Sequence, residues 1–233
     1  MKTVKYIKDK FEKDGFIVLR NLLTKKEISD FEKKLFMVYS KKLQKKLNHK
    51  NIHEIIFETE KKKYFDLLYS CYKNFIKTSP YQKVQKKLFF FSRKIFKKKF
   101  KYLNTGMAIG IRNSKRTAYN WHQEQSYYTV KNTIHFQFPI IIPAKKINGT
   151  MSVLSGSQKV GPITEVTNIK LSKKAINTYL PKNISRLKKK FTEKFINMKL
   201  GDVCMFSDNI VHRTNRNYSN KIRFVPIVRL QST

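Results

Sequence analysis

Five short apolar stretches after residue 101, separated by tight-turn residues, restrict the fold of this chain more than any other feature. Each is rich in Ile, Val, Met and Phe and is too short for a helix that buries one face. Turn sequences such as Asn148-Gly149 and Gly201-Asp202 lie between them. Short strands joined by tight turns, with no helical heptads between them, indicate a sandwich or barrel. The stretches are residues 107–111, 134–138, 151–154, 203–206 and 222–225.

The first 101 residues have a helical pattern instead. A short helix is expected to end at Gly15, and residues 16–19 to form a brief strand. Thr24 and Glu27 have the spacing of a capping box, in which the hydroxyl and the carboxylate accept from each other's backbone amides. Apolar residues then recur at helical spacing. These are Ile28, Phe31, Leu35 and Val38.

No Pro-, Gly- or Ser-rich linker separates the two halves, so we expect a single domain over residues 1–233. Residues 1–101 would form a mainly helical layer packed on a β core of residues 102–233. A lysine-rich and weakly patterned segment near residues 170–199 is interpreted as an insertion into that core.

Positive charge dominates the composition, with 51 Lys and Arg against 15 Asp and Glu and a formal net charge of +36. A basic surface can bind nucleic acid, anionic lipid or a phosphorylated substrate. The excess is spread along the whole chain, however, and Lys far outnumbers Arg. We interpret it mainly as a compositional bias in which lysine is the default solvated residue.

Composition also excludes several classes of protein. Hydrophobic residues make up 40% of the chain, which is enough for a core and excludes disorder. The longest uncharged apolar run, residues 136–144, is far shorter than the roughly 20 residues of a membrane span. The charged N-terminus lacks a signal-peptide core, and Cys71 and Cys204 cannot build a disulfide framework. We therefore expect a cytoplasmic protein.

His122 and Glu124 are the first candidate metal ligands. Residues i and i+2 of a strand project to one face, so both side chains can reach one cation. His212 supplies a second imidazole beside the stretch 203–206. Two His and one carboxylate form the facial triad of non-heme Fe(II) oxygenases, which leaves positions open for a co-substrate and O₂. The alternative is an exposed polar strand end without a metal.

Arg223 is the candidate for binding an acidic co-substrate. It lies within the apolar stretch 222–225, and an arginine inside a barrel needs an anionic partner because an unpaired buried charge costs several kcal/mol. The keto acid 2-oxoglutarate can bind a metal at one end and place its distal carboxylate on such an arginine. Thr214 would face the same side as His212 and donate a hydroxyl to that carboxylate. The alternative is an arginine exposed at the surface.

Together these motifs resemble the phytanoyl-CoA dioxygenase family over nearly the whole chain. The resemblance implies a mainly β fold with flanking helices (α+β), with a double-stranded β-helix (jelly-roll, cupin-like) core and an N-terminal helical layer. It also implies Fe(II), 2-oxoglutarate as co-substrate and O₂, with hydroxylation of a substrate and release of succinate and CO₂. The motifs lie at residues 11–20, 121–124, 148–150, 155–159, 201–206, 212–217 and 223–224.

Five residues match the functional positions of that family. The resemblance assigns the iron ligands to His122, Glu124 and His212. It assigns the distal carboxylate of 2-oxoglutarate to Arg223, with help from Thr214.

Three residues depart from the family pattern. Its carboxylate ligand is usually Asp, so Glu124 adds a methylene and can ligate only if the backbone shifts. Gln158 stands where a His is usual, away from the iron. Phe138 replaces a common Trp, which would alter the pocket wall. Related halogenases lack the carboxylate, so Glu124 argues against halogenation.

Two classes of function remain after these observations. The first is an Fe(II)- and 2-oxoglutarate-dependent dioxygenase that hydroxylates a small organic molecule, and the lysine excess is compatible with an anionic one. The second is a catalytically degenerate jelly-roll protein that binds nucleic acid or an anionic glycan through its basic surface. The sequence lacks the aromatic and basic motifs of RNA-binding sheets, so we do not expect nucleic acid as a partner. The sequence leaves the substrate and the oligomeric state open.

Overall fold

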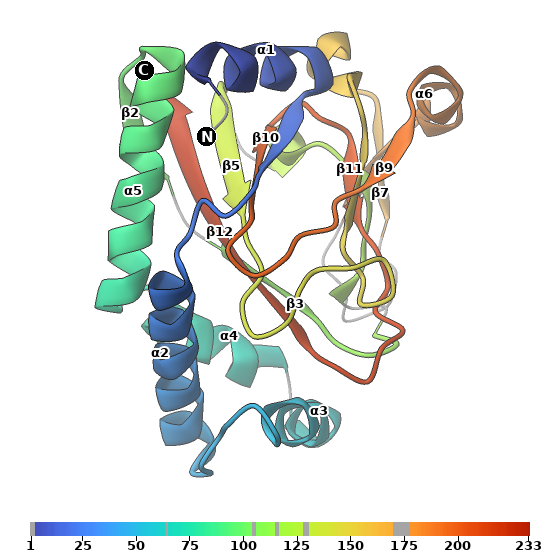
Figure 1. Cartoon of the computed structure of the whole chain (residues 1–233). Coiled ribbons are helices and arrows are strands. Elements are labelled where there is room, and N and C mark those ends of the chain that lie inside the picture. Colours follow the sequence, from blue (N-terminus) through green and yellow to red (C-terminus); the bar gives the residue numbers. More distant parts are fainter. Residues whose placement is uncertain (1–2, 64, 104–105, 115–116, 128–130, 170–177) are drawn as a thin grey trace.

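The computed structural model describes residues 3–63, 65–103, 106–114, 117–127, 131–169 and 178–233. Five of its helices precede the β-rich part of the chain (Figure 1). The helices are α1 (Val4–Asp14), α2 (Lys25–Leu43), α3 (Ile52–Lys63), α4 (Phe65–Phe75), α5 (Ser79–Phe96) and α6 (Ile184–Lys190).

Two antiparallel sheets form the core. The larger sheet has the order β1-β10-β5-β12-β2, and β3 also pairs with β12. Its strands are β1 (Phe16–Leu19), β2 (Phe100–Tyr102), β3 (Gly106–Gly110), β5 (Thr133–Gln137), β10 (Val203–Ser207) and β12 (Arg223–Ser232). The smaller sheet has the order β4-β11-β6-β9, from β4 (Tyr119–His122), β6 (Met151–Leu154), β9 (Glu193–Phe195) and β11 (His212–Thr214). A separate pair joins β7 (Val166–Ile169) to β8 (Thr178–Pro181).

The chain passes back and forth between the two sheets. Strands β3, β4, β5 and β6 alternate between the larger and the smaller sheet, and β9 to β12 alternate again. This alternation defines a double-stranded β-helix, or jelly roll. The predicted fold class, mainly β with flanking helices, is confirmed.

The loop of residues 215–222 joins strands of different sheets. Strand β11 belongs to the smaller sheet and β12 to the larger one. The loop therefore crosses from one sheet to the other.

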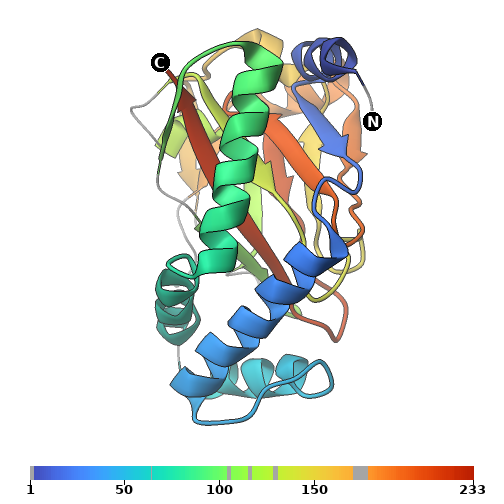
Figure 2. The same cartoon turned by 60° about the vertical axis from the view of Figure 1, so that its left-hand side comes forward.

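The helical layer covers the outer face of the larger sheet. Figure 2 shows the green helix α5 in front of the dark red strand β12. The Tyr81 hydroxyl of α5 donates to the backbone carbonyl of Ile227 in β12 at 3.0 Å. Phe31 of α2 is fully buried, and its ring packs edge-on against that of Phe138 with centroids 5.4 Å apart. Phe138 therefore belongs to the core under the helices, and the predicted place on a pocket wall is wrong.

The predicted helix boundaries are confirmed. Helix α1 ends at Gly15, which has a φ of 79° and donates its backbone N–H to the Phe11 carbonyl at 2.8 Å. The left-handed backbone at this position favours glycine. At the start of α2, the Glu27 amide donates to the Thr24 hydroxyl at 3.1 Å, and the Thr24 amide donates to the Glu27 carboxylate at 2.7 Å. The capping box fixes the turn from β1 into α2.

Replacing Thr24 with Ala should lower the free energy of unfolding by about 1 kcal/mol, because it leaves a helix N-terminal amide without its acceptor. Chemical denaturation of the two proteins measures this difference. Thr164 is exposed in a loop, so Thr164→Ala is the matched control and should be neutral. Equal stability of Thr24→Ala and the wild type would show that the capping box contributes nothing.

The segment near residues 170–199 is only partly the insertion that we expected. Residues 170–177 lie outside the described residues. The remainder contains β8, α6 and β9, and β9 pairs with β6 in the smaller sheet, Ser152 opposite Phe195. The end of this segment is therefore part of the β core.

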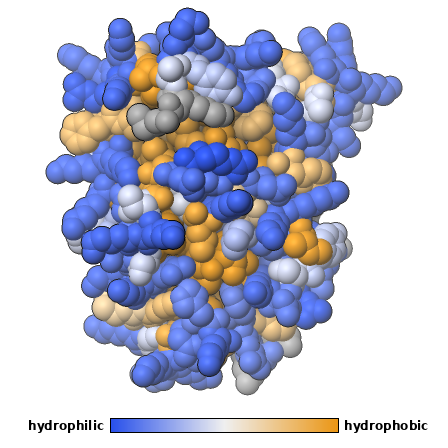
Figure 3. Space-filling view, in the orientation of Figure 1, coloured by the Kyte–Doolittle hydropathy of each residue, from blue (hydrophilic) through white to orange (hydrophobic). Residues whose placement is uncertain are grey.

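The surface is mostly hydrophilic on the face that Figure 3 shows, with apolar residues gathered across its centre. Exposed lysine side chains lie on α1, α2, α4 and α5. Among the described helices, none combines the length and the apolar composition that crossing a membrane requires.

Candidate metal centre

His122 and His212 meet because their strands are neighbours in the smaller sheet. His122 is the last residue of β4, His212 is the first of β11, and the two are direct register partners. Both side chains are buried, and their ring centroids lie 4.3 Å apart. The sequence places them 90 residues apart, and the pairing of β4 with β11 brings them together.

The backbone orients both imidazole rings in the same way. His122 Nδ1 lies 2.6 Å from the Asn120 carbonyl oxygen, and His212 Nδ1 lies 3.0 Å from the Ile210 carbonyl oxygen. A carbonyl oxygen only accepts hydrogen bonds, so each Nδ1 carries the proton and donates. Each Nε2 is left with a lone pair, which is the arrangement of a metal-binding histidine.

The sequence predicts Glu124 on a strand with His122, and this prediction is wrong. Strand β4 ends at His122, and Glu124 begins a 3-10 helix, Glu124–Tyr127. Its side chain still points toward the histidines, with Oε1 3.5 Å from His212 Nε2 and 3.9 Å from His122 Nε2. The turn after His122 thus brings the Glu124 carboxylate to the two histidines.

Gln123 fixes this turn, and the sequence analysis gave it no role. It is almost fully buried, and its amide nitrogen donates to the carbonyls of Gly161 at 2.9 Å and Asn209 at 2.6 Å. Its amide oxygen accepts from the Ile163 amide at 2.9 Å. The side chain between the two candidate ligands thus ties the 3-10 helix to two neighbouring loops.

The residues present fit an iron ion. One ligand atom from each of His122, Glu124 and His212 lies within 4.8 Å of the others, and all three residues are buried. Two imidazole nitrogens and one carboxylate oxygen are the donor set of the facial Fe(II) triad.

The protonation states suit metal binding as well. Burial would raise the pKa of the Glu124 carboxyl, but the positive charge of Arg229 and the adjacent imidazoles of His122 and His212 hold that pKa well below its ordinary value. Burial and the neighbouring His212 lower the pKa of His122. A charged carboxylate beside a neutral imidazole is the state that coordinates a cation.

The larger sheet contributes two residues that the sequence analysis did not place in the site. Arg229 Nη2 of β12 lies 3.4 Å from Glu124 Oε2, and His135 Nδ1 of β5 lies 3.9 Å from the same oxygen. His135 is fully buried beside the carboxylate. Arg229 lies six residues after Arg223 in one strand, so the two share a face. The even spacing from Arg223 was therefore the feature of the sequence that could have indicated Arg229.

Arg223 is buried and, within the described part of the chain, has an unpaired donor for an acidic ligand. It is 3% exposed, and burial lowers its pKa to about 10, so the guanidinium remains charged near neutral pH. Its Nε donates to the Asn148 carbonyl at 3.1 Å, while its Nη2 has no hydrogen-bond partner among the described residues. Gly110 lies opposite Arg223, where a Cβ would come within 3.3 Å of Nε. A buried donor without an acceptor fits a carboxylate ligand.

Thr214 lies two residues after His212 in β11, and the pairing of β11 with β4 shifts register between them. Among the described residues, no hydrogen bond links Thr214 to Arg223. The structure therefore brings His122, Glu124 and His212 into contact and leaves Arg223 and Thr214 on two strands of opposite sheets.

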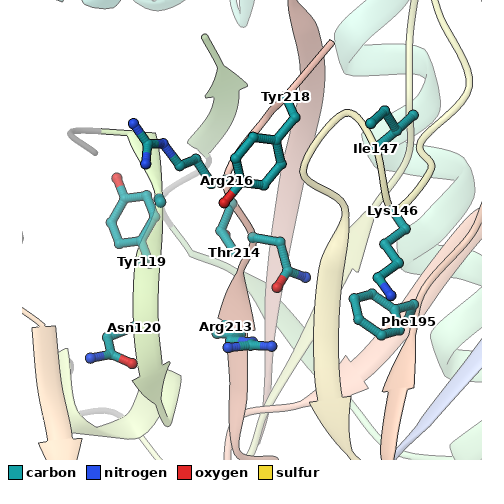
Figure 4. Close-up of a pocket in the computed structure, with 11 residues that line it drawn as sticks. Tyr119, Asn120, Lys146, Ile147, Phe195, Arg213, Thr214, Arg216 and Tyr218 are labelled. Carbon is teal, nitrogen blue, oxygen red and sulfur yellow. The ribbon is translucent and has the colours of Figure 1, made fainter. Parts of the chain in front are cut away.

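A separate pocket of about 650 Å³ lies at the smaller sheet (Figure 4). Thr214 lines it, but none of the three candidate metal ligands does. Its basic side chains already have partners in the structure: Lys146 lies over the Phe195 ring, Arg213 bonds to Glu193, and Arg216 donates to the Asn113 carbonyl. We therefore do not assign this pocket to the metal centre.

A double-stranded β-helix with a buried His-Glu-His cluster defines the class of non-heme iron oxygenases. The family model for phytanoyl-CoA dioxygenase (PhyH) matches residues 11–225, and the chain belongs to this family of Fe(II)- and 2-oxoglutarate-dependent oxygenases. A comparison with curated proteins finds no significant sequence match.

Solved structures show the same fold at low sequence identity. EctD from S. alaskensis, solved with 2-oxoglutarate and 5-hydroxyectoine, has a TM-score of 0.60 and 13% identity over 99% of this chain and 76% of its own. AviO1 from Streptomyces viridochromogenes Tue57 has a TM-score of 0.60 and 10% identity over 99% of this chain and 96% of its own. The epimerase SnoN, in complex with Fe3+, alpha ketoglutarate and nogalamycin RO, has a TM-score of 0.66 and 7% identity over 98% of this chain and 83% of its own.

Proposed function

We propose that this oxygenase hydroxylates a small organic substrate and holds its iron through His122, Glu124 and His212. One observation carries the proposal: two imidazole Nε2 atoms, each with its Nδ1 bonded to a backbone carbonyl, converge with a carboxylate oxygen inside the β-helix core of a PhyH-family chain. The degenerate binding protein that we considered as the alternative gains no support from the family or from this cluster.

Each part of the site has a task in this proposal. His122, Glu124 and His212 would hold the metal, and a site with three protein ligands would leave positions for co-substrate and O₂. When bound, iron and 2-oxoglutarate supply the oxidising chemistry that converts a substrate C–H bond to C–OH, while 2-oxoglutarate and O₂ yield succinate and CO₂. The protein binds and orients these groups and excludes water from them.

Arg223 and Thr214 would hold the distal carboxylate of 2-oxoglutarate. The free Nη2 of Arg223 needs an acceptor, and a carboxylate supplies one. The hydroxyl of Thr214 would donate a second hydrogen bond from the opposite sheet. The two residues would thus bind the co-substrate at the end away from the metal.

The reaction type and the substrate class rest on less specific support. SnoN, a structural neighbour, is named an epimerase, so this fold also serves outcomes other than hydroxylation. We propose hydroxylation from the family assignment and an anionic substrate from the net charge of +36. A cytoplasmic location agrees with two buried free thiols, Cys71 and Cys204. We also propose that residues 1–233 act as a single domain.

Succinate formation tests this proposal without knowledge of the substrate. Purified protein with Fe(II), 2-oxoglutarate and O₂ should form succinate slowly, and a tight metal chelator should stop it. Addition of the true substrate should accelerate it. Protein that binds Fe(II) but forms no succinate above a protein-free control would contradict the proposal. Salt-sensitive binding to generic DNA without iron uptake would instead support the alternative.

A further inference from the structure

The two oxygens of the Glu124 carboxylate face different sets of partners. Oε1 lies 3.5 Å and 3.9 Å from the Nε2 atoms of His212 and His122. Oε2 lies 3.4 Å from Arg229 Nη2 and 3.9 Å from His135 Nδ1. One oxygen is thus directed to the metal-binding histidines of the smaller sheet, and the other to Arg229 and His135 on the larger sheet.

Arg229 meets this carboxylate from a strand inside the larger sheet. It lies within β12, which pairs with β5 on one side and with β2 and β3 on the other. The whole residue is 8% exposed. A Cβ at Gly106 would come within 3.0 Å of Arg229 Nη1, so the absence of a side chain there leaves space for the guanidinium. The sheet therefore presents a charged, pre-oriented donor to Glu124.

His135 completes the second set of partners. It is the register partner of Arg229, and its ring stacks on Phe206 with centroids 5.1 Å apart. Its Nε2 lies 2.8 Å from the Thr133 hydroxyl. When that hydroxyl donates to Nε2, the proton of the neutral ring lies on Nδ1, which faces Glu124.

We propose that Arg229 is a positioning residue for the metal-binding carboxylate, holding Oε2 of Glu124 so that Oε1 is directed to His122 and His212. This inference rests on the proposed function, because it takes Glu124 as a metal ligand. It also explains how glutamate serves where the family usually has aspartate. The longer side chain has one more rotatable bond, and the ion pair with Arg229 removes the added freedom.

Metal affinity measured without turnover is the direct test. Arg229→Gln should weaken binding of Co(II), used alone as the probe, by about 10- to 100-fold, the usual cost of removing a residue that orients a metal ligand. Arg229→Lys keeps the charge without the planar donor fork, so it should restore part of the loss. The matched control is Arg213→Gln, which removes a 2.7 Å pair with Glu193 on the other face of β11 and should leave Co(II) affinity unchanged.

Combination with Glu124→Asp separates positioning from a general structural role. The shorter carboxylate cannot reach both sets of partners, so Glu124→Asp alone should weaken Co(II) binding. Because the contact with Arg229 is then already lost, adding Arg229→Gln should cost little more. The two substitutions should thus be strongly non-additive. Additive losses would overturn the inference, as would wild-type Co(II) affinity in folded Arg229→Gln.

These outcomes are distinct from failure of the proposed function. A wild type that binds Co(II) and forms no succinate contradicts the function, yet the affinity series still tests Arg229. A wild type that forms succinate while Arg229→Gln and wild type bind Co(II) equally contradicts only the inference. If Arg229→Gln does not fold, as circular dichroism would show, Arg229→Lys is compared with the wild type instead. Unchanged Co(II) affinity and an unchanged Co(II) absorption spectrum in Arg229→Lys would then overturn the inference.

Discussion

Replacement of either His122 or His212 with Ala is expected to abolish saturable Fe(II) binding and the formation of succinate. Each residue supplies one of only two imidazole nitrogens in the cluster, and both are buried, so water cannot easily replace a lost ring. A site with one histidine and one carboxylate holds Fe(II) poorly. Anaerobic Fe(II) titration and a succinate assay measure the two losses.

A histidine outside the cluster provides the control for these variants. His49 has an exposed side chain on the helical layer, 3.5 Å from Glu32, so His49→Ala should retain both iron binding and succinate formation. Wild-type succinate production in His122→Ala or His212→Ala would show that the substituted residue is not a ligand. The assignment of the triad would then be wrong.

Arg223→Lys should lower the affinity for 2-oxoglutarate by about 10- to 100-fold, or about 1.4 to 2.8 kcal/mol. Arg223 is buried, and its Nη2 has no hydrogen-bond partner among the described residues, so the planar guanidinium fork keeps a donor available to a carboxylate. Lysine keeps the charge but offers a single ammonium group, which cannot replace the fork. Calorimetric titration of the Fe(II) protein with 2-oxoglutarate, without O₂, measures the change.

Two measurements distinguish this role from general damage to the protein. Fe(II) affinity without the keto acid should barely change in Arg223→Lys. Arg216 lies in the loop before β12 and donates to the Asn113 carbonyl, so Arg216→Lys should leave 2-oxoglutarate affinity intact. Undiminished 2-oxoglutarate affinity in Arg223→Lys, with normal iron binding, would contradict the co-substrate assignment. The resemblance would then describe a fold and not a reaction.

Local sequence signals predicted the secondary structure that they directly determine. The Thr24 and Glu27 pair gave the start of α2, and Gly15 gave the end of α1. The stretch 151–154 is strand β6 residue for residue, because it is bounded by turn sequences on both sides. Each of these signals acts within a few residues of the boundary that it sets.

Features that depend on distant pairing were not visible in the sequence. Strand β9 is three residues long and lies in a lysine-rich segment, so only its pairing with β6 reveals it as part of the core. Strand β12 extends from Arg223 to Ser232, well past the predicted stretch 222–225. Pairing with β2, β3 and β5 makes the strand longer than its apolar stretch. Local apolar residues alone do not reveal that pairing.

In the candidate metal site, too, the sequence revealed local features and did not reveal those that depend on distant strand pairing. The spacing of His122 and Glu124 indicated two ligands, although the strand geometry assumed for Glu124 was wrong. His135 and Arg229 reach Glu124 only because β5 and β12 are paired in the larger sheet, opposite the histidines. Neither residue belongs to a motif. The resemblance pointed to the ligands, and the structure added the residues behind the carboxylate.

Anaerobic titration with Fe(II) and then 2-oxoglutarate tests the central claim most directly. Chelation of the keto acid by a protein-bound iron gives a metal-to-ligand charge-transfer band that neither component shows alone. We expect this band in the wild type, saturating at one equivalent of each, and expect to lose it in His212→Ala. A wild type that binds Fe(II) and develops no band at saturating 2-oxoglutarate would contradict the account.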